Sequence, residues 1–220
     1  MKCSFLAVLI AALALVTQTA NADIISCDFA SETGASIKFT GTGNLIEFPN
    51  TTYDFAITTA TSPNLGGLQG NIGGTFVVGT ITAVGGVEQA SVTTADGTFS
   101  VDDGASNTLT ADLDWKDILV FGKLVGAMNV TGITNLSNVS YSGSNSDLLG
   151  IKNGSDQTVI LTFMFSPFTK KSLTELMADG QVNSTSYSGS LSSVPEPSAC
   201  VLLGMAALGL LAYGWRRHLS

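Results

Sequence analysis

The stretch Leu109-Thr110-Ala111-Asp112-Leu113-Asp114-Trp115 alternates apolar and polar residues, and this pattern recurs along most of the chain. Alternation with a period of two places the apolar side chains on one face of a β-strand. Gly, Asn and Asp clusters, which we interpret as turns and which include residues 70–74 and Asp96-Gly97, interrupt the runs about every eight to twelve residues, a spacing typical of all-β sandwiches. We therefore predict an all-β fold, a jelly-roll-like β-sandwich.

The other alternating runs and two short helical patterns complete this prediction. We expect helices at residues 145–151, with Ser146 as the N-cap, and at 172–178, where Ser172 and Glu175 form a capping-box pattern. Strands are predicted at residues 25–29, 37–39, 46–48, 53–57, 75–84, 86–93, 99–101, 109–115, 118–121, 123–131, 135–141, 158–165 and 182–191. The aromatic residues predicted to fill the core are Phe29, Phe39, Phe55, Phe99, Trp115, Phe163 and Tyr187.

The N-terminus has the features of a secretory signal peptide. Lys2 is followed by a twelve-residue apolar core at 5–16, and Ala20 and Ala22 fit a small-x-small cleavage site. The sequence predicts a signal peptide helix over residues 1–22, removed by signal peptidase after Ala22. The mature part then divides into an extracytoplasmic β-sandwich at 23–187 and a polar tether at 188–193.

A second export-related signal occupies residues 194–220. Val194, Pro195, Glu196 and Pro197 precede an uncharged apolar run at 198–215, and Arg216, Arg217 and His218 follow as a basic tail. Eighteen helical residues extend about 27 Å, close to the roughly 30 Å hydrocarbon core of a bilayer. Positive residues mark the cytoplasmic side, so we predict a single transmembrane helix with the body outside. An ordinary C-terminal anchor would show the same helix.

The order of these parts resembles the PEP-CTERM sorting domain of exported bacterial proteins. The resemblance implies recognition of Pro195, Glu196 and Pro197 by a membrane-embedded exosortase, with residues 198–215 as a transient anchor and Arg216-Arg217 as the stop-transfer cluster. It further implies an inner-membrane intermediate, and then the cell surface or extracellular polysaccharide matrix of a Gram-negative-type bacterium. The expected partners are signal peptidase, exosortase, the membrane and extracellular polysaccharide.

Composition excludes several functions for the mature part. Residues 23–193 carry sixteen Asp and Glu, six Lys and no Arg, a net charge of −10, which disfavours nucleic acid. The single histidine, His218, lies in the basic tail, so a Ser–His or Cys–His pair and histidine-ligated zinc are excluded. We expect no enzymatic activity and no cofactor apart from Ca²⁺.

Six aspartates, at 96, 102, 103, 112, 114 and 117, suggest that calcium hypothesis. Asp112 and Asp114 would repel each other on one strand face, and a bound Ca²⁺ would offset this repulsion. The ligand candidates are Asp102, Asp103, Asp112 and Asp114. The solvated polar face of a strand is the alternative.

Three functions compete for the mature domain. The first is a non-enzymatic surface or matrix protein of the exopolysaccharide or biofilm. The second is a carbohydrate-binding module with sugars stacked on exposed rings; its candidates are Trp115, Tyr53, Tyr141 and Tyr187. The third is a hydrolase with paired carboxylates, such as Glu47 with Asp54 or Glu88 with an aspartate.

Overall fold

The computed structural model describes residues 24–49, 52–121, 130–163 and 171–195. The predicted signal peptide, the apolar run 198–215 and the basic tail lie outside the described residues. No helix among the described residues is long and apolar enough to cross a membrane. Residues Ile24–Val194 form one compact unit, which we call the β-domain.

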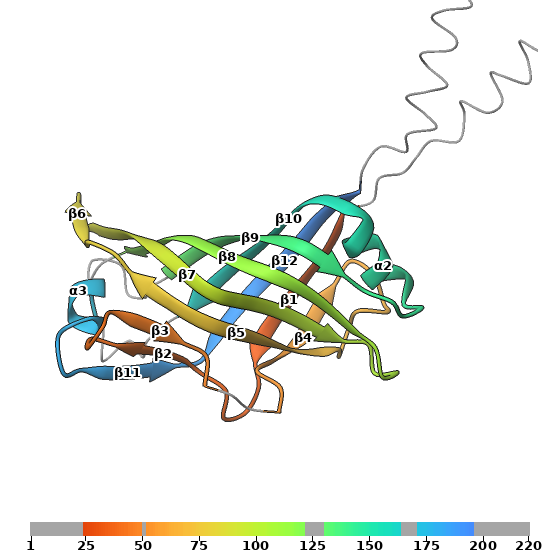
Figure 1. Cartoon of the computed structure of the whole chain (residues 1–220), viewed down its shortest axis with the longest axis horizontal. Helices are drawn as coiled ribbons and strands as arrows, with labels where there is room; N and C mark the ends of the chain where they lie inside the picture. Colours follow the sequence, from red (N-terminus) through yellow and green to blue (C-terminus); the bar gives the residue numbers. More distant parts are fainter. Residues whose placement is uncertain (1–23, 50–51, 122–129, 164–170, 196–220) are drawn as a thin grey trace, which may run out of the picture. The chain divides into compact units, whose positions relative to one another are not determined.

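The domain is built on one large antiparallel sheet with two short helices (Figure 1). The all-β prediction is confirmed. The strands are β1 Ile25–Ser31, β2 Ile37–Thr40, β3 Leu45–Glu47, β4 Phe55–Ala60, β5 Gln69–Val78, β6 Thr82–Val84, β7 Val87–Asp102, β8 Thr108–Phe121, β9 Val130–Ser140, β10 Gly154–Phe163, β11 Val182–Thr185 and β12 Tyr187–Pro195, and the helices are α2 Ser146–Asn153 and α3 Leu173–Leu176.

The sheet folds back on itself. Its strand order is β11-β2-β3-β5-β4-β1-β12-β10-β9-β8-β7-β6, and β5 also pairs with β7. The additional pairing joins distant parts of the sheet, and β2, β3 and β11 continue from the other edge of β5. Strands that are not hydrogen-bonded neighbours therefore face each other across one apolar interior, as in a sandwich.

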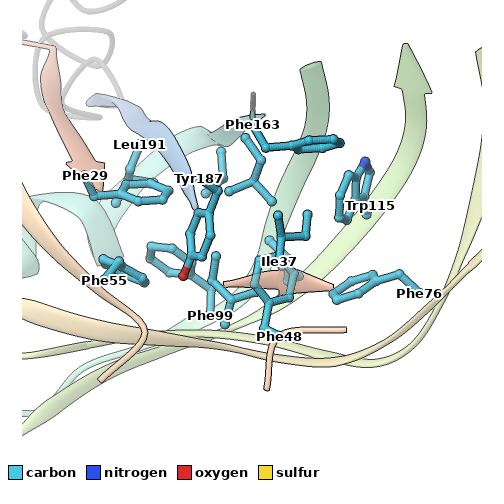
Figure 2. Packing of buried hydrophobic residues seen from close by; sticks show 14 of the residues in the cluster. Phe29, Ile37, Phe48, Phe55, Phe76, Phe99, Trp115, Phe163, Tyr187 and Leu191 are labelled. Carbon is cyan, nitrogen blue, oxygen red and sulfur yellow. The ribbon is translucent and has the colours of Figure 1, made fainter. Parts of the chain in front are cut away.

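Aromatic contacts across this interior hold the facing strands together. The ring centroids of Phe39 in β2 and Phe163 in β10 are 4.7 Å apart, and those of Phe76 in β5 and Trp115 in β8 are 5.3 Å apart. All seven predicted core aromatics are buried, with at most 4% of their surface exposed. Figure 2 labels six of them, all except Phe39, within the apolar interior. Burial of each such side chain contributes about 1.5–3 kcal/mol. The alternation of apolar residues therefore identified the interior correctly.

Two predicted turns are parts of strands instead. Residues 70–74 lie inside β5, paired with β7, and Asp96-Gly97 lies inside β7. Asp96 has a positive φ of 53°, and the pairing with β5 shifts register at this point. A Cβ atom on Gly97 would be 2.1 Å from the carbonyl oxygen of Leu113, so only glycine fits here. Asp-Gly thus forms a bulge within a long strand.

The polar tether predicted at 188–193 is wrong, because these residues belong to β12. Leu191 and Ser193 are 1% and 0% exposed, and Ser193 pairs with Ile25 of β1. The serine-rich composition suggested a solvated segment, but alternation continues through it, and serine is small enough for the crowded interior. The β-domain therefore extends to Val194 instead of ending at Tyr187.

The two predicted helices are confirmed, with one change of cap. Asn145, and not Ser146, caps α2, because its side-chain oxygen accepts from the backbone N–H groups of Asp147 and Leu148. For α3 the capping box is present: Ser172 accepts from the Glu175 N–H, and the Glu175 carboxylate accepts from the Ser172 N–H.

Candidate functional site

The chain enters and leaves the β-domain through neighbouring strands. Cys27 pairs with Leu191, and Ile25 at the start of β1 pairs with Ser193 near the end of β12. One predicted processing signal therefore precedes β1 and the other follows β12, and these two strands pair with each other. We call the paired strand ends, residues 24–26 and 192–195, the β1/β12 end. Ala20, Ala22, Glu196, Pro197, Arg216 and Arg217 lie outside the described residues.

The first residues of the predicted sorting signal belong to the folded domain. Val194 is extended and 42% exposed, and Pro195 is the last residue of β12. The preceding Ser193 is fully buried, and its hydroxyl has no hydrogen-bond partner among the described residues. Gly154, the first residue of β10, contacts this segment so closely that a Cβ atom there would lie 2.1 Å from the Ser193 Oγ.

The candidate calcium ligands Asp102 and Asp103 lie at the turn between β7 and β8. Asp102 accepts from the Gly104 N–H at 2.7 Å. Asp103 accepts from the N–H groups of Asn107 and Ala105 and from the Tyr141 hydroxyl, the last at 2.7 Å. These donors, led by the Asn107 backbone N–H, lower the pKa of Asp103 to about 2. Both carboxylates thus close the turn.

Asp112 and Asp114 lie on the outer surface of β8, as the alternation predicts. The Asp112 carboxylate accepts from the side-chain amide of Asn138 at 2.6 Å, and Asp114 forms an ion pair with Lys116. These partners relieve the like-charge repulsion that motivated the calcium hypothesis. Across the described ranges, no group of three or more His, Cys, Asp or Glu side chains is placed to hold a metal ion.

A polar hollow lies beside these aspartates. The bulge in β7 and the adjoining part of β8 line an open hollow of about 500 Å³. Its lining is Thr94, Asp96, Gly97, Thr98, Asp112, Leu113 and Asp114. Hydroxyl and carboxylate groups dominate this lining, and it contains no aromatic ring.

The rings proposed to stack on sugars do not form a platform. Trp115, Tyr141 and Tyr187 are 0%, 2% and 4% exposed. Each also uses its polar atom internally; the Trp115 Nε1–H, for example, donates to the carbonyl oxygen of Asp117 at 2.8 Å. Tyr53 is half-buried and donates to Asp102 at 3.4 Å.

The acidic residues considered for hydrolysis also have structural partners. Glu47 pairs with Lys38 at 3.0 Å, and buried Asp54 accepts from the Ile72 N–H at 3.0 Å. Glu88 accepts from both the N–H and the hydroxyl of Thr174 in the first turn of α3. Sequence reasoning missed this link because 86 residues separate its two partners.

Comparison with known proteins identifies the C-terminal segment. The PEP-CTERM protein-sorting motif matches residues 193–217, from buried Ser193 to Arg217. No curated protein and no solved structure matches the chain. The match begins inside β12, so the motif and the β-domain overlap at Ser193 and Val194. The chain therefore carries a PEP-CTERM sorting signal, and it is an exported protein sorted by an exosortase at the membrane.

Proposed function

We propose that the mature domain is a non-enzymatic component of the cell surface or extracellular polysaccharide matrix of a Gram-negative-type bacterium. The observation that carries the proposal is the sorting motif at residues 193–217, which marks the chain as an exported protein processed at the membrane. The β-domain is the part that remains there after processing.

The outer surface of β7, β8 and β9 supports association with polysaccharide. Outward residues along β7, β8 and residues 135–140 of β9 are mainly Ser, Thr, Asn and Asp, and they lie side by side across the sheet: Thr98 beside Asp112, and Asp112 beside Ser137. Hydroxyl, amide and carboxylate groups form hydrogen bonds with sugar hydroxyls. The hollow of about 500 Å³ beside Asp112 adds a recess to this polar face.

The use of the acidic residues supports a role without catalysis. Asp54, Asp103 and Glu88 each accept hydrogen bonds that close a strand pair, a turn or a helix end. A general acid or base must instead be free to reach a substrate proton. Stacking of sugars on aromatic rings is not part of the proposal, because Trp115, Tyr141 and Tyr187 are buried.

Fractionation of the producing cells tests this proposal. The mature chain should be recovered with the extracellular polysaccharide, and digestion of that polysaccharide should release it. A matched variant, Thr98→Val with Ser137→Ala, removes hydroxyls from the outer face and should weaken retention in the matrix. Recovery of the mature chain in the culture medium, equally with and without the polysaccharide, would contradict a matrix role.

A further inference from the structure

Two properties of the β1/β12 end limit the access of a processing enzyme to the sorting signal. Ser193 pairs with Ile25, so the segment that begins the motif is part of the sheet. In the strand order β12 lies between β1 and β10, so it is not an edge strand. Enzymes that process peptides bind them in extended form, through backbone groups and side-chain pockets. A strand with a neighbour on either side does not offer those groups.

The length of chain outside the sheet adds to this constraint. Only four residues, 194–197, separate Ser193 from the apolar run that begins at Ser198. Four extended residues reach at most about 14 Å. The folded domain is therefore directly adjacent in sequence to the recognition element, without a linker that would let an enzyme bind it independently.

The buried Ser193 hydroxyl lowers the cost of opening the last part of β12. It is fully buried without a hydrogen-bond partner among the described residues, and burial of an unsatisfied hydroxyl is destabilising. When the strand end separates, water can bind this hydroxyl. Local opening of such segments occurs without global unfolding.

We propose that exosortase processes this chain through a state in which the β12 end has separated from β1, and that Ser193 and Gly154 set the population of that state. Both are positioning residues, since they act through the conformation of the motif. This inference rests on sorting by exosortase and is independent of the role proposed for the mature domain.

Two substitutions should change processing in opposite directions. Ser193→Ala removes the unsatisfied hydroxyl, stabilises the closed end and should slow conversion of precursor to mature chain about fivefold or more. Gly154→Ala places a methyl group against the Ser193 Oγ, destabilises the closed end and should accelerate conversion. Ser192→Ala, next to Ser193 and paired with Ser26, is the matched control and should process like the wild type.

A linker separates this effect from direct recognition of Ser193. Six Gly and Ser residues inserted between Ser193 and Val194 leave Val-Pro-Glu-Pro intact but free it from β12. Conversion should then be fast, and adding Gly154→Ala should change nothing further. The same six residues inserted between Gly85 and Gly86, in the turn after β6, control for chain length.

The measurement is a pulse-chase of the full chain in cells that contain the exosortase, with thermal melts of each purified full-length precursor. Opposite shifts for Ser193→Ala and Gly154→Ala, and a fast linker variant, support the proposal. Equal rates for both folded variants and the wild type would overturn it. If Gly154→Ala gives no cooperative melt, the linker variant is the deciding test. Conversion of the linker variant no faster than that of the wild type would refute the opening step.

Discussion

The two ends of strand β12 differ in how well their polar groups are satisfied. At the first end, the Tyr187 hydroxyl donates to the carbonyl oxygen of Asp54 at 3.1 Å, and its backbone N–H donates to the Ser31 hydroxyl at 3.2 Å. Its ring packs edge-on against Phe48, with centroids 5.2 Å apart. Burial, with a smaller contribution from the Asp54 charge, raises the pKa of Tyr187.

At the other end, Ser193 is equally buried but its hydroxyl has no partner among the described residues, and Val194 is exposed. The difference indicates that one end of a strand can be held firmly in the sheet while the other end separates from its neighbours more easily. A processing enzyme can then separate the final residues while the Tyr187 end keeps the core intact. The following predictions test this difference, from the largest effect to the smallest.

Tyr187→Ala should destabilise the whole domain by about 3–5 kcal/mol, because it removes a buried ring and leaves a cavity. Thermal unfolding should shift down by about 2–4 °C per kcal/mol for a domain of this size. Tyr187→Phe is the matched control and should lose only about 1 kcal/mol, the contribution of the hydrogen bond to Asp54. A Tyr187→Ala melt close to that of Tyr187→Phe would show that this end is not an anchor.

Gly154→Ala should reduce the unfolding free energy by about 1–3 kcal/mol, because the added methyl group crowds the Ser193 Oγ. The loss should be smaller in a Ser193→Ala background, where that oxygen is absent. Denaturant unfolding of the wild type, both single variants and the double variant measures this coupling. Additive losses would place the strain elsewhere than at the Ser193 side chain.

Cys27, paired with Leu191 between the two ends of β12, reports on opening of the strand pair. Burial raises its pKa from 9.0 to about 12. Since the thiolate is the reactive form, labelling by a thiol reagent at pH 8 should be about a thousandfold slower in the folded chain than in the unfolded chain. Gly154→Ala should accelerate the labelling of Cys27 only if the separation of β12 from β1 extends from Ser193 to Cys27.

The same shift predicts a pH dependence. The folded state keeps the Cys27 proton above pH 9 while the unfolded state releases it, so the stabilisation is complete below pH 9 and is lost as the pH rises toward 12. Melts between pH 8 and pH 11 should fall more steeply for the wild type than for Cys27→Ala. Parallel curves would contradict this.

Calcium should have the smallest effect. The carboxylates of Asp103, Asp112 and Asp114 have their own hydrogen-bond or ion-pair partners, so melts with calcium and with chelator should have equal midpoints. An increase of several degrees with calcium, absent in Asp112→Asn, would support the calcium hypothesis.

Much of the interior could be predicted because burial follows strand alternation. Leu109, Leu113 and Trp115 are buried, as their alternating positions predict. The capping box of Ser172 is present at the residues where the sequence predicts it. The tether was mispredicted for a physical reason: serine is polar enough to suggest solvent, yet small enough for a tight interior position at 193. A turn was predicted at Asp96-Gly97, where the structure has a bulge, because Asp-Gly is a common turn signal.

The sequence by itself determined that the chain is exported and sorted. The PEP-CTERM motif, with its apolar run, is a continuous stretch of sequence, and its recognition needs no contact between distant parts of the chain. It also determined the all-β class, since alternation with a period of two is a local property. Only the tertiary structure decided that Ser193 faces Gly154 and pairs with Ile25, and that Glu88 caps α3. These contacts join residues far apart in the chain, and their geometry depends on which strands pair.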